Sequence, residues 1–283
     1  MHQALTGRRA RLTELIQLRH DVFWAARADL RRYGFLEIDT PTFQRNKGGG
    51  TSTPFRVHVG GAFCAAVAPH DLLKYVVAAG IVERAFELRH RLRPDAADWE
   101  HEPEYSVLEM CFFTSGTRSA TVFVDRLGRR MLHAARRHFP HRARALKRLI
   151  GQPWPVVAMQ QLLAVSLRIP AAVLFDRSGL VRRTERLSIP LPGADGVGPL
   201  QQQLFEHAVR PRLRTPVFVR YARLYPSFEL FMPGGTEVCN MFEVQEAKGP
   251  GACFAAVIGV DRLLQAAAGR TPIQGVIPFP WDR

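Results

Sequence analysis

The sequence predicts an α+β protein in which an antiparallel sheet is flanked by helices. Short apolar or alternating runs bounded by turn residues recur along the chain, which is typical of strands. Loops rather than helices separate most of these runs, and helical periodicity is confined to a few segments, which favours an antiparallel sheet. The chain has 283 residues, 47% of them hydrophobic, so it can form a globular core.

The first half of the chain contains a long helix followed by strands. Residues 9–33 are predicted to be an amphipathic helix, because apolar side chains recur at three- and four-residue steps before Gly34. FLEIDTP, which ends at Pro41, alternates as a short strand does. The further expected elements are a Gly-rich loop (47–54), strands FRVHV and FCAAVA, a helix from about His70 to Gly80, strand RAFEL, a polar loop (93–104) and strand YSVLEMCFF.

The second half has no clear periodicity between residues 151 and 211, where the pattern predicts only the loop PLPGADGVGP. From TPVFV onward the pattern predicts strands TPVFV and FELFM, a PGG turn, strands TEVCNMF and CFAAVIG, and a closing helix over 261–268. The sequence has neither an internal repeat nor a clear linker. We therefore expect residues 1–283 to form a single domain.

The charge is strongly positive, with 39 Lys and Arg against 25 Asp and Glu and a formal net charge of +14. Such a field attracts nucleotides, nucleic acid or acidic proteins. The densest basic block covers residues 127–150, where Leu and Ala recur between arginines at helical spacing. This block is either a solvated helix face or a contact surface for an acidic partner.

The composition also restricts the class of protein. No apolar run approaches the roughly 20 residues of a membrane-spanning helix, and the first residues lack the apolar core of a signal peptide. We therefore expect a cytoplasmic protein without a membrane partner. The four cysteines are scattered without a C-x-x-C pair, which indicates neither a zinc site nor a disulfide framework.

Three segments, FLEIDTP, FELRHRLRPD with HEPEYSVLEM, and GVDRLL, follow one another in an informative order. Together they resemble motifs 1, 2 and 3 of the class II aminoacyl-tRNA synthetases, the lysyl branch in particular, at about residues 19–41, 84–112 and 253–268. Motif 1 begins close to residue 1, so we expect no preceding anticodon-binding barrel. The chain is in this respect most similar to the freestanding elongation factor P lysine ligase type of paralogue.

This resemblance implies a site for ATP and Mg²⁺. It places Arg93 on the α-phosphate, Arg262 near the γ-phosphate and Tyr105 against adenine, with Asp95 and His101 also at the nucleotide. The resemblance assigns magnesium to Glu229 and Glu237, although the segment between them is one residue longer than usual. The chemistry is consistent, because a carboxylate attacking a phosphate needs neutralising cations and no general base.

The resemblance also implies an amino-acid pocket, and several of its positions differ from the lysyl pattern. His70 stands in place of a Glu, Cys111 in place of a Tyr and Val257 in place of a Gly, while Asp95 of the ATP site replaces a Glu. These changes leave the amino acid open. The full set of expected substrate-binding residues is His70, Glu109, Cys111, Asn240, Glu243 and Val257.

Two classes of function follow from the sequence. The first is a ligase that forms an aminoacyl-adenylate and transfers the amino acid to a protein side chain, a small molecule or tRNA. The second is a non-catalytic synthetase paralogue that binds an amino acid, a nucleotide or RNA. In either class the motif 1 resemblance implies a homodimer.

Overall fold

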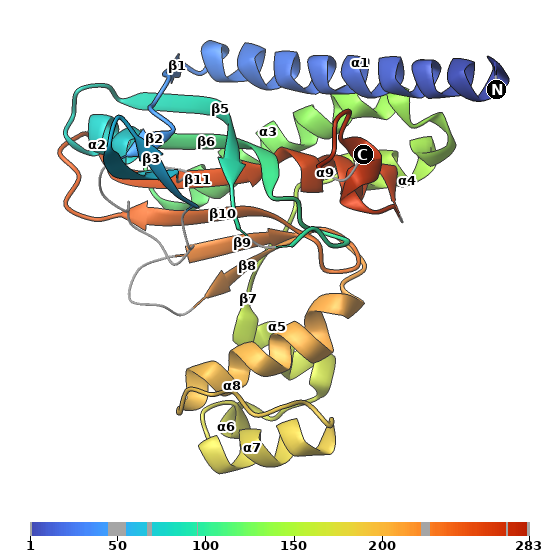
Figure 1. Cartoon of the computed structure of the whole chain (residues 1–283). Helices are drawn as coiled ribbons and strands as arrows, with labels where there is room; N and C mark the ends of the chain where they lie inside the picture. Colours follow the sequence, from blue (N-terminus) through green and yellow to red (C-terminus); the bar gives the residue numbers. More distant parts are fainter. Residues whose placement is uncertain are drawn as a thin grey trace. The chain divides into compact units, whose positions relative to one another are not determined.

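The computed structural model describes residues 2–44, 55–66, 70–94, 96–221, 227–269 and 271–281. The chain divides into two compact units, Met1–Pro153 with Val238–Arg283, and Trp154–Glu237. Each unit combines helices with strands, and most of the strand pairs are antiparallel, which confirms the α+β class (Figure 1). Whether both units act as one catalytic domain stays a prediction. No described helix has the length and apolar character needed to cross a membrane.

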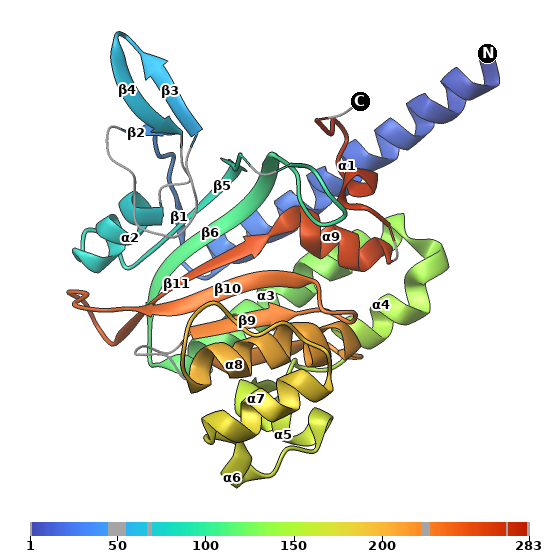
Figure 2. The same cartoon turned by 60° about the horizontal axis from the view of Figure 1, so that its bottom comes forward.

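The first unit is built on a sheet with the strand order β1 (Leu36–Glu37), β5 (Arg84–Leu92), β6 (Glu104–Thr114), β11 (Ala252–Gly259) and β10 (Glu237–Val244) (Figure 2). Only β1 and β5 pair in parallel, and the other neighbours are antiparallel. Residues 106–113 of β6 are all buried, as expected for a central strand covered on both faces.

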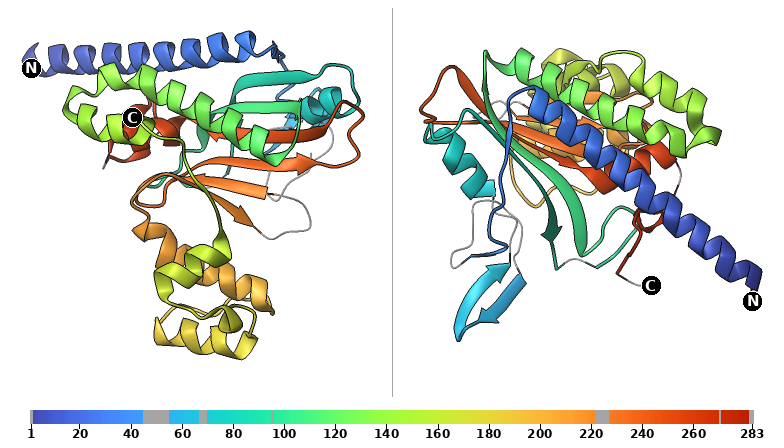
Figure 3. Two further views of the ribbon diagram at one scale, coloured as in Figure 1. Left: turned by 180° about the vertical axis from the view of Figure 1, so that it is seen from behind. Right: turned by 90° about the horizontal axis from the view of Figure 1, so that it is seen from above.

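The long helix predicted from residue 9 is α1 (His2–Arg32), and it packs along α3 (Thr117–Ala135) (Figure 3). Leu18, Val22, Ala26 and Leu30 are fully or almost fully buried at four-residue steps, which places them in one stripe of the helix. The helix ends where Gly34 adopts a φ of +77° and the amide of Phe35 donates to the carbonyl of Leu30 at 3.0 Å.

Helices cover both faces of this sheet. Rings of Phe35, Phe112 and Phe123 lie 5.2–5.5 Å apart, so α3 covers the face that carries Phe112. On the other face, α2 (His70–Ala78) packs Leu73 and Val77 into an apolar cluster with strand residues of β5, β6 and β11. The odd-numbered residues of β6 therefore face α2, and the even-numbered residues face α3.

The remaining elements of the first unit are short. The basic block predicted as helical is divided between the end of α3, the 3₁₀ turns Arg136–His138 and Pro140–Arg142, and α4 (Ala143–Ile150). Pro140 ends the helical run, because proline lacks the amide donor that a continuous helix requires. The list is completed by α9 (Val260–Ala268), the turn Ile273–Val276 and a small antiparallel sheet of β2 (Phe43–Gln44), β4 (Ala62–Ala66) and β3 (Phe55–Val59). The predicted loop 47–54 lies outside the described residues.

The second unit contains the segment that the sequence left unassigned. β8 (Val217–Tyr221) pairs in parallel with β7 (Val156–Ala158) and antiparallel with β9 (Ser227–Phe231). Its helices are α5 (Met159–Leu167), α6 (Ala171–Leu174), α7 (Arg177–Arg186) and α8 (Val197–Leu204), followed by the π-helix Phe205–Val209 and the 3₁₀ turn Arg210–Arg212. A continuous apolar core joins these helices to the strands.

Candidate active site

A row of side chains crosses the α2-covered face of the first unit's sheet. The strand register pairs Glu87 with Glu109, Glu109 with Val257, and Val257 with Asn240. Directly paired residues of antiparallel strands point to the same face, so three residues predicted from motifs far apart in the chain form one line. These are Glu109, Val257 and Asn240, and the three strands that carry them, β6, β11 and β10, lie side by side in Figure 2.

Tyr105 and Cys111 share this face, because each lies an even number of residues from Glu109 on β6. Tyr105 is half-buried and pairs with Arg91 on β5. Cys111 is fully buried inside the apolar cluster under α2. The two residues thus differ in exposure: Tyr105 keeps surface that a ligand can contact, whereas Cys111 has none. A substrate contact by Cys111 stays a prediction.

Cys111 also forms a close pair with Cys253 on the neighbouring strand, with 3.5 Å between the two Sγ atoms. The hydrogen bond with Cys253, together with burial, raises the pKa of the Cys111 thiol. The thiol therefore stays protonated at neutral pH and is not a nucleophile.

Glu109 is held by an ion pair that the sequence analysis did not identify. Nε of Arg91 donates to Oε1 of Glu109 at 2.5 Å, and the Glu109 side chain has no exposed surface. A charge at that depth requires a partner. The alternation of charged residues at positions 87, 89 and 91 could have indicated that Arg91 faces the site.

The Thr-Pro end of motif 1 is fixed to the same face by a second network. The amide and the hydroxyl of Thr40 each donate to the Glu87 carboxylate at 2.8 Å, and Arg89 donates to the Thr40 hydroxyl at 2.7 Å. Glu87 is 3% exposed. These bonds connect motif 1 to β5, so the chain after α1 is positioned against the row of Glu109.

The predicted motif 2 loop closes on itself and onto α9. The amide of Arg93 donates to the carbonyl of Pro103 at 2.8 Å. The His101 ring contacts the Asp98 carboxylate at 2.7 Å. Partial burial raises the pKa of Asp98, but hydrogen bonds from the Glu100 amide and His101 outweigh it and lower that pKa overall. Asp95, predicted at the nucleotide, lies outside the described residues.

Arg262 borders this loop from α9. Its Nε donates to the carbonyl of Glu100 at 3.3 Å, and Gln265 donates to the carbonyl of Trp99 at 2.8 Å. Both Arg93 and Arg262 are half-buried. The two arginines predicted from motifs 2 and 3 therefore lie at the same loop, although 169 residue positions separate them in the sequence.

The Asp of GVDRLL has a structural role. Asp261 is 2% exposed, accepts a hydrogen bond from the Ser106 amide at 2.7 Å and pairs with Arg19 of α1. One carboxylate thus joins α1, β6 and α9. The neighbouring Arg262 is directed to the loop because Asp261 fixes the first turn of α9.

One of the predicted substrate residues, Glu243, is not brought to the row. Glu243 pairs with Phe254 and is three residues from Asn240 on β10, so it points to the opposite face, and its predicted contact beside Asn240 is wrong. The cause is the two-residue period of a strand, which an odd offset reverses. His70 begins α2, and its side chain lies outside the described residues.

The predicted magnesium ligands lie in the second unit. Glu229 is the central residue of β9, Glu237 is the first residue of β10, and both are half-buried. Burial, and then the nearby Glu229 carboxylate, raise the pKa of Tyr221. Within the described ranges, no three His, Cys, Asp or Glu side chains gather as a metal cluster. Two carboxylates nevertheless fit magnesium, which is usually held by one or two of them together with water and phosphates.

Comparison with known proteins agrees with the resemblance to the class II synthetases. The family model of class II tRNA synthetases (D, K and N) matches residues 2–216. The lysine–tRNA ligase of Chromohalobacter salexigens is 26% identical over 86% of this chain and 52% of its own length. That of Kineococcus radiotolerans is 32% identical over 72% of this chain and 42% of its own.

A further relative is the lysylphosphatidylglycerol biosynthesis bifunctional protein LysX of Rhodococcus jostii, which is 28% identical over 72% of this chain and 19% of its own length. The matches to these three relatives thus cover about half of their length or less.

Proposed function

Because the chain belongs to the class II tRNA synthetase family (D, K and N), we propose that it is an ATP-dependent ligase that activates an amino acid as its adenylate. The observation that carries the proposal is the row of Glu109, Val257 and Asn240 on the face of Tyr105, beside the loop bordered by Arg93 and Arg262. An amino acid on this row would lie next to a nucleotide held at the loop.

The reaction assigned to this face is the attack of the substrate carboxylate on the α-phosphorus of ATP. An oxygen–phosphorus bond forms, the bond to the β-phosphate oxygen breaks, and pyrophosphate leaves. The guanidinium of Arg93 neutralises the α-phosphate, and that of Arg262 the terminal phosphate. Tyr105 supplies an aromatic face for adenine, and Asn240 orients the substrate carboxylate.

Magnesium is assigned to Glu229 and Glu237, and when bound it neutralises phosphate charge. His101 remains the proposed contact of the triphosphate tail. Its bond to Asp98 orients the ring, and a protonated ring would add a further positive charge at the loop.

The acceptor in this proposal is a protein side chain or a small molecule. The relatives' names point to two acceptors, tRNA for the lysine–tRNA ligases and a lipid product for LysX, and tRNA stays the alternative. A homodimer through α1 is also proposed, and Ile16, 48% exposed on this helix, is an apolar contact for a second copy.

A non-catalytic paralogue is the second candidate. Two observations favour it: Cys111 is enclosed in apolar side chains, and the Glu109 carboxylate already forms an ion pair with Arg91. Both reduce the number of polar groups left to bind an amino acid.

Magnesium-dependent ATP–pyrophosphate exchange tests the proposal. The substrates are the protein amino acids, β-lysine and ornithine, and Arg93→Ala should lower exchange by about 100-fold or more, the usual cost of one oxyanion-stabilising donor. Arg212→Ala, an exposed charge in the other unit, is the matched control and should leave exchange unchanged. Exchange that survives Arg93→Ala would remove the assigned role, and absence of both exchange and ATP binding would favour the paralogue.

A further inference from the structure

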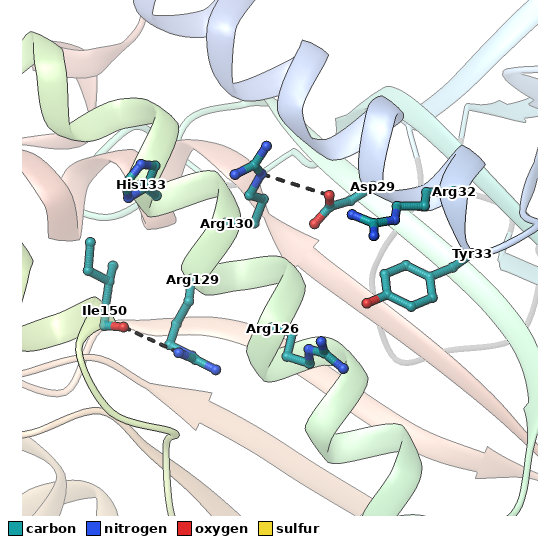
Figure 4. Close-up of a pocket in the computed structure, with 8 residues that line it drawn as sticks. All are labelled: Asp29, Arg32, Tyr33, Arg126, Arg129, Arg130, His133 and Ile150. Atoms are coloured by element: carbon teal, nitrogen blue, oxygen red, sulfur yellow. Dashed lines mark hydrogen bonds and ion pairs between the residues drawn. The ribbon is translucent and has the colours of Figure 1, made fainter.

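A basic groove, the α1–α3 groove, lies between these two helices. It consists of two cavities of about 380 and 410 Å³ that share His133 as a lining residue. Figure 4 shows the first cavity, in which Arg32, the last residue of α1, and Tyr33, which follows it, point towards the side of α3 that carries its arginines. The lining residues are Asp29, Arg32, Tyr33, Arg126, Arg129, Arg130, His133 and Ile150 in the first cavity, and Asp21, Trp24, Ala134, Arg136 and Arg137 with His133 in the second.

Several of these guanidinium groups have N–H donors that are available to a ligand. Arg32 and Arg126 are exposed and make no hydrogen bond or ion pair with another described residue. Arg130 approaches Asp29 only to 3.8 Å. Arg129 differs, because its guanidinium donates to the Asp125 carboxylate and to the carbonyl of Ile150. Since a guanidinium carries five N–H donors, the first cavity offers three arginines to an incoming anion.

The second cavity extends the charge along α3. Asp21 is engaged by Arg137 and His138, whereas Arg136 adds a further cation at the lining. Together the groove has six lining arginines against the aspartates 21, 29 and 125, an excess of three positive charges. From Arg126 to Arg137 the cations extend over about 16 Å at 1.5 Å per residue.

The groove is remote from the proposed adenylation face. Phe123 of α3 packs against Phe112, an even-numbered residue of β6, whereas Glu109 and Tyr105 point to the other side of the sheet. A ligand of the groove is therefore neither the amino acid nor the ATP of the proposed reaction. The inference does not depend on the proposed function.

We propose that the α1–α3 groove binds the phosphate backbone of single-stranded RNA. A line of guanidinium groups over about 16 Å can contact several successive phosphates, more than one nucleotide presents. The exposed indole of Trp24 in the second cavity supplies a stacking face for a base, and aromatic faces between cations are characteristic of single-strand recognition.

The test is the fluorescence anisotropy of a short labelled RNA of mixed sequence, titrated with the full chain at several sodium chloride concentrations. Each phosphate contact on a single strand contributes about 0.7 to the slope of log K against log salt. The double variant Arg126→Ala/Arg130→Ala should therefore reduce the slope by about 1.4 and weaken binding about 25-fold in about 0.1 M salt.

The matched control is Arg212→Ala/Arg214→Ala, which removes the same charge from exposed positions in the second unit and should retain RNA affinity. Equal losses in both double variants would overturn the proposal, because binding would then follow net charge alone. Unchanged affinity in the groove variant would overturn it as well. Preference for a polyglutamate peptide over RNA, lost in the groove variant, would assign the groove to an acidic protein instead.

Trp24→Ala separates a nucleic acid from a simple polyanion. It should weaken RNA but leave inorganic polyphosphate binding unchanged, because polyphosphate has no base to stack. If Trp24→Ala bound RNA as tightly as wild type does, and polyphosphate as tightly as well, the groove would bind phosphate chains in general. The proposal of RNA would then fail. ATP–pyrophosphate exchange should stay the same in all groove variants, which separates this outcome from a failure of the adenylation proposal.

Discussion

The two faces of the first unit's sheet use charge in opposite ways. On the α2-covered face, Glu109 is fully buried and neutralised by Arg91, and Glu87 is saturated by Thr40 and Arg89. Beyond the other face, the arginines of the α1–α3 groove are mostly exposed. Buried charges need partners and so position the chain, whereas exposed cations without partners are available to ligands.

The largest expected effect is on the buried side of this comparison. Arg91→Ala would remove the guanidinium that pairs with the buried Glu109 carboxylate, and we expect it to lower the free energy of unfolding by about 3–5 kcal/mol. Urea denaturation measures this loss. The double variant Arg91→Ala/Glu109→Gln should recover part of it, because no charge is then left buried. A loss below about 1 kcal/mol would place Glu109 in a wetter environment.

A buried phenol in the second unit extends the comparison to pH. Burial and Glu229 raise the pKa of Tyr221 above its ordinary value of 10.0. The unfolded chain therefore loses this proton first as pH rises, so the stability due to Tyr221 is complete below pH 10 and is lost above it.

The expected loss is about 1.4 kcal/mol per pH unit above the ordinary pKa. Urea denaturation of wild type and Tyr221→Phe at pH values on both sides of 10.0 measures the stability that Tyr221 contributes at each pH. The other titrating groups are common to both proteins and cancel in the difference. Parallel pH profiles of the two proteins would mean that the phenol is hydrated in the folded state.

The smallest effect is expected on the exposed side. Arg126→Ala/Arg130→Ala should change the free energy of unfolding by no more than about 0.5 kcal/mol, because exposed charges contribute little to stability. The same urea series used for Arg91→Ala measures it. A loss comparable to that of Arg91→Ala would mean that the groove arginines hold α1 and α3 together, and the contrast between the two faces would disappear.

Local sequence patterns predicted most elements of the first unit. The long helix ending at Gly34, the strands of motifs 2 and 3 and the closing helix are all confirmed. Each has a clear period of its own, either four-residue steps or uninterrupted apolar runs. The segment 151–211 was not predicted, because its short helices, such as Ala171–Leu174, depend on the core that they form together.

The candidate site was predicted unevenly. Motif order identified Glu109, Val257 and Asn240, and the register places them in one row. It did not identify Arg91, because the alternation at positions 87, 89 and 91 indicates only which face Arg91 takes and not the carboxylate that it pairs with. It also misplaced Glu243, because counting along a strand without knowing its register leaves the face undetermined.

The sequence by itself determined the fold class, the family resemblance and the positive charge of this protein, since each follows from residue order or composition. Only the tertiary structure decided which charges are buried and paired and which are exposed. It gave Asp261 an anchoring role beside Arg262, and it aligned the arginines of α3 with Arg32 of α1 into a groove. The reason is that burial and pairing depend on contacts between segments distant in sequence, which residue order alone does not specify.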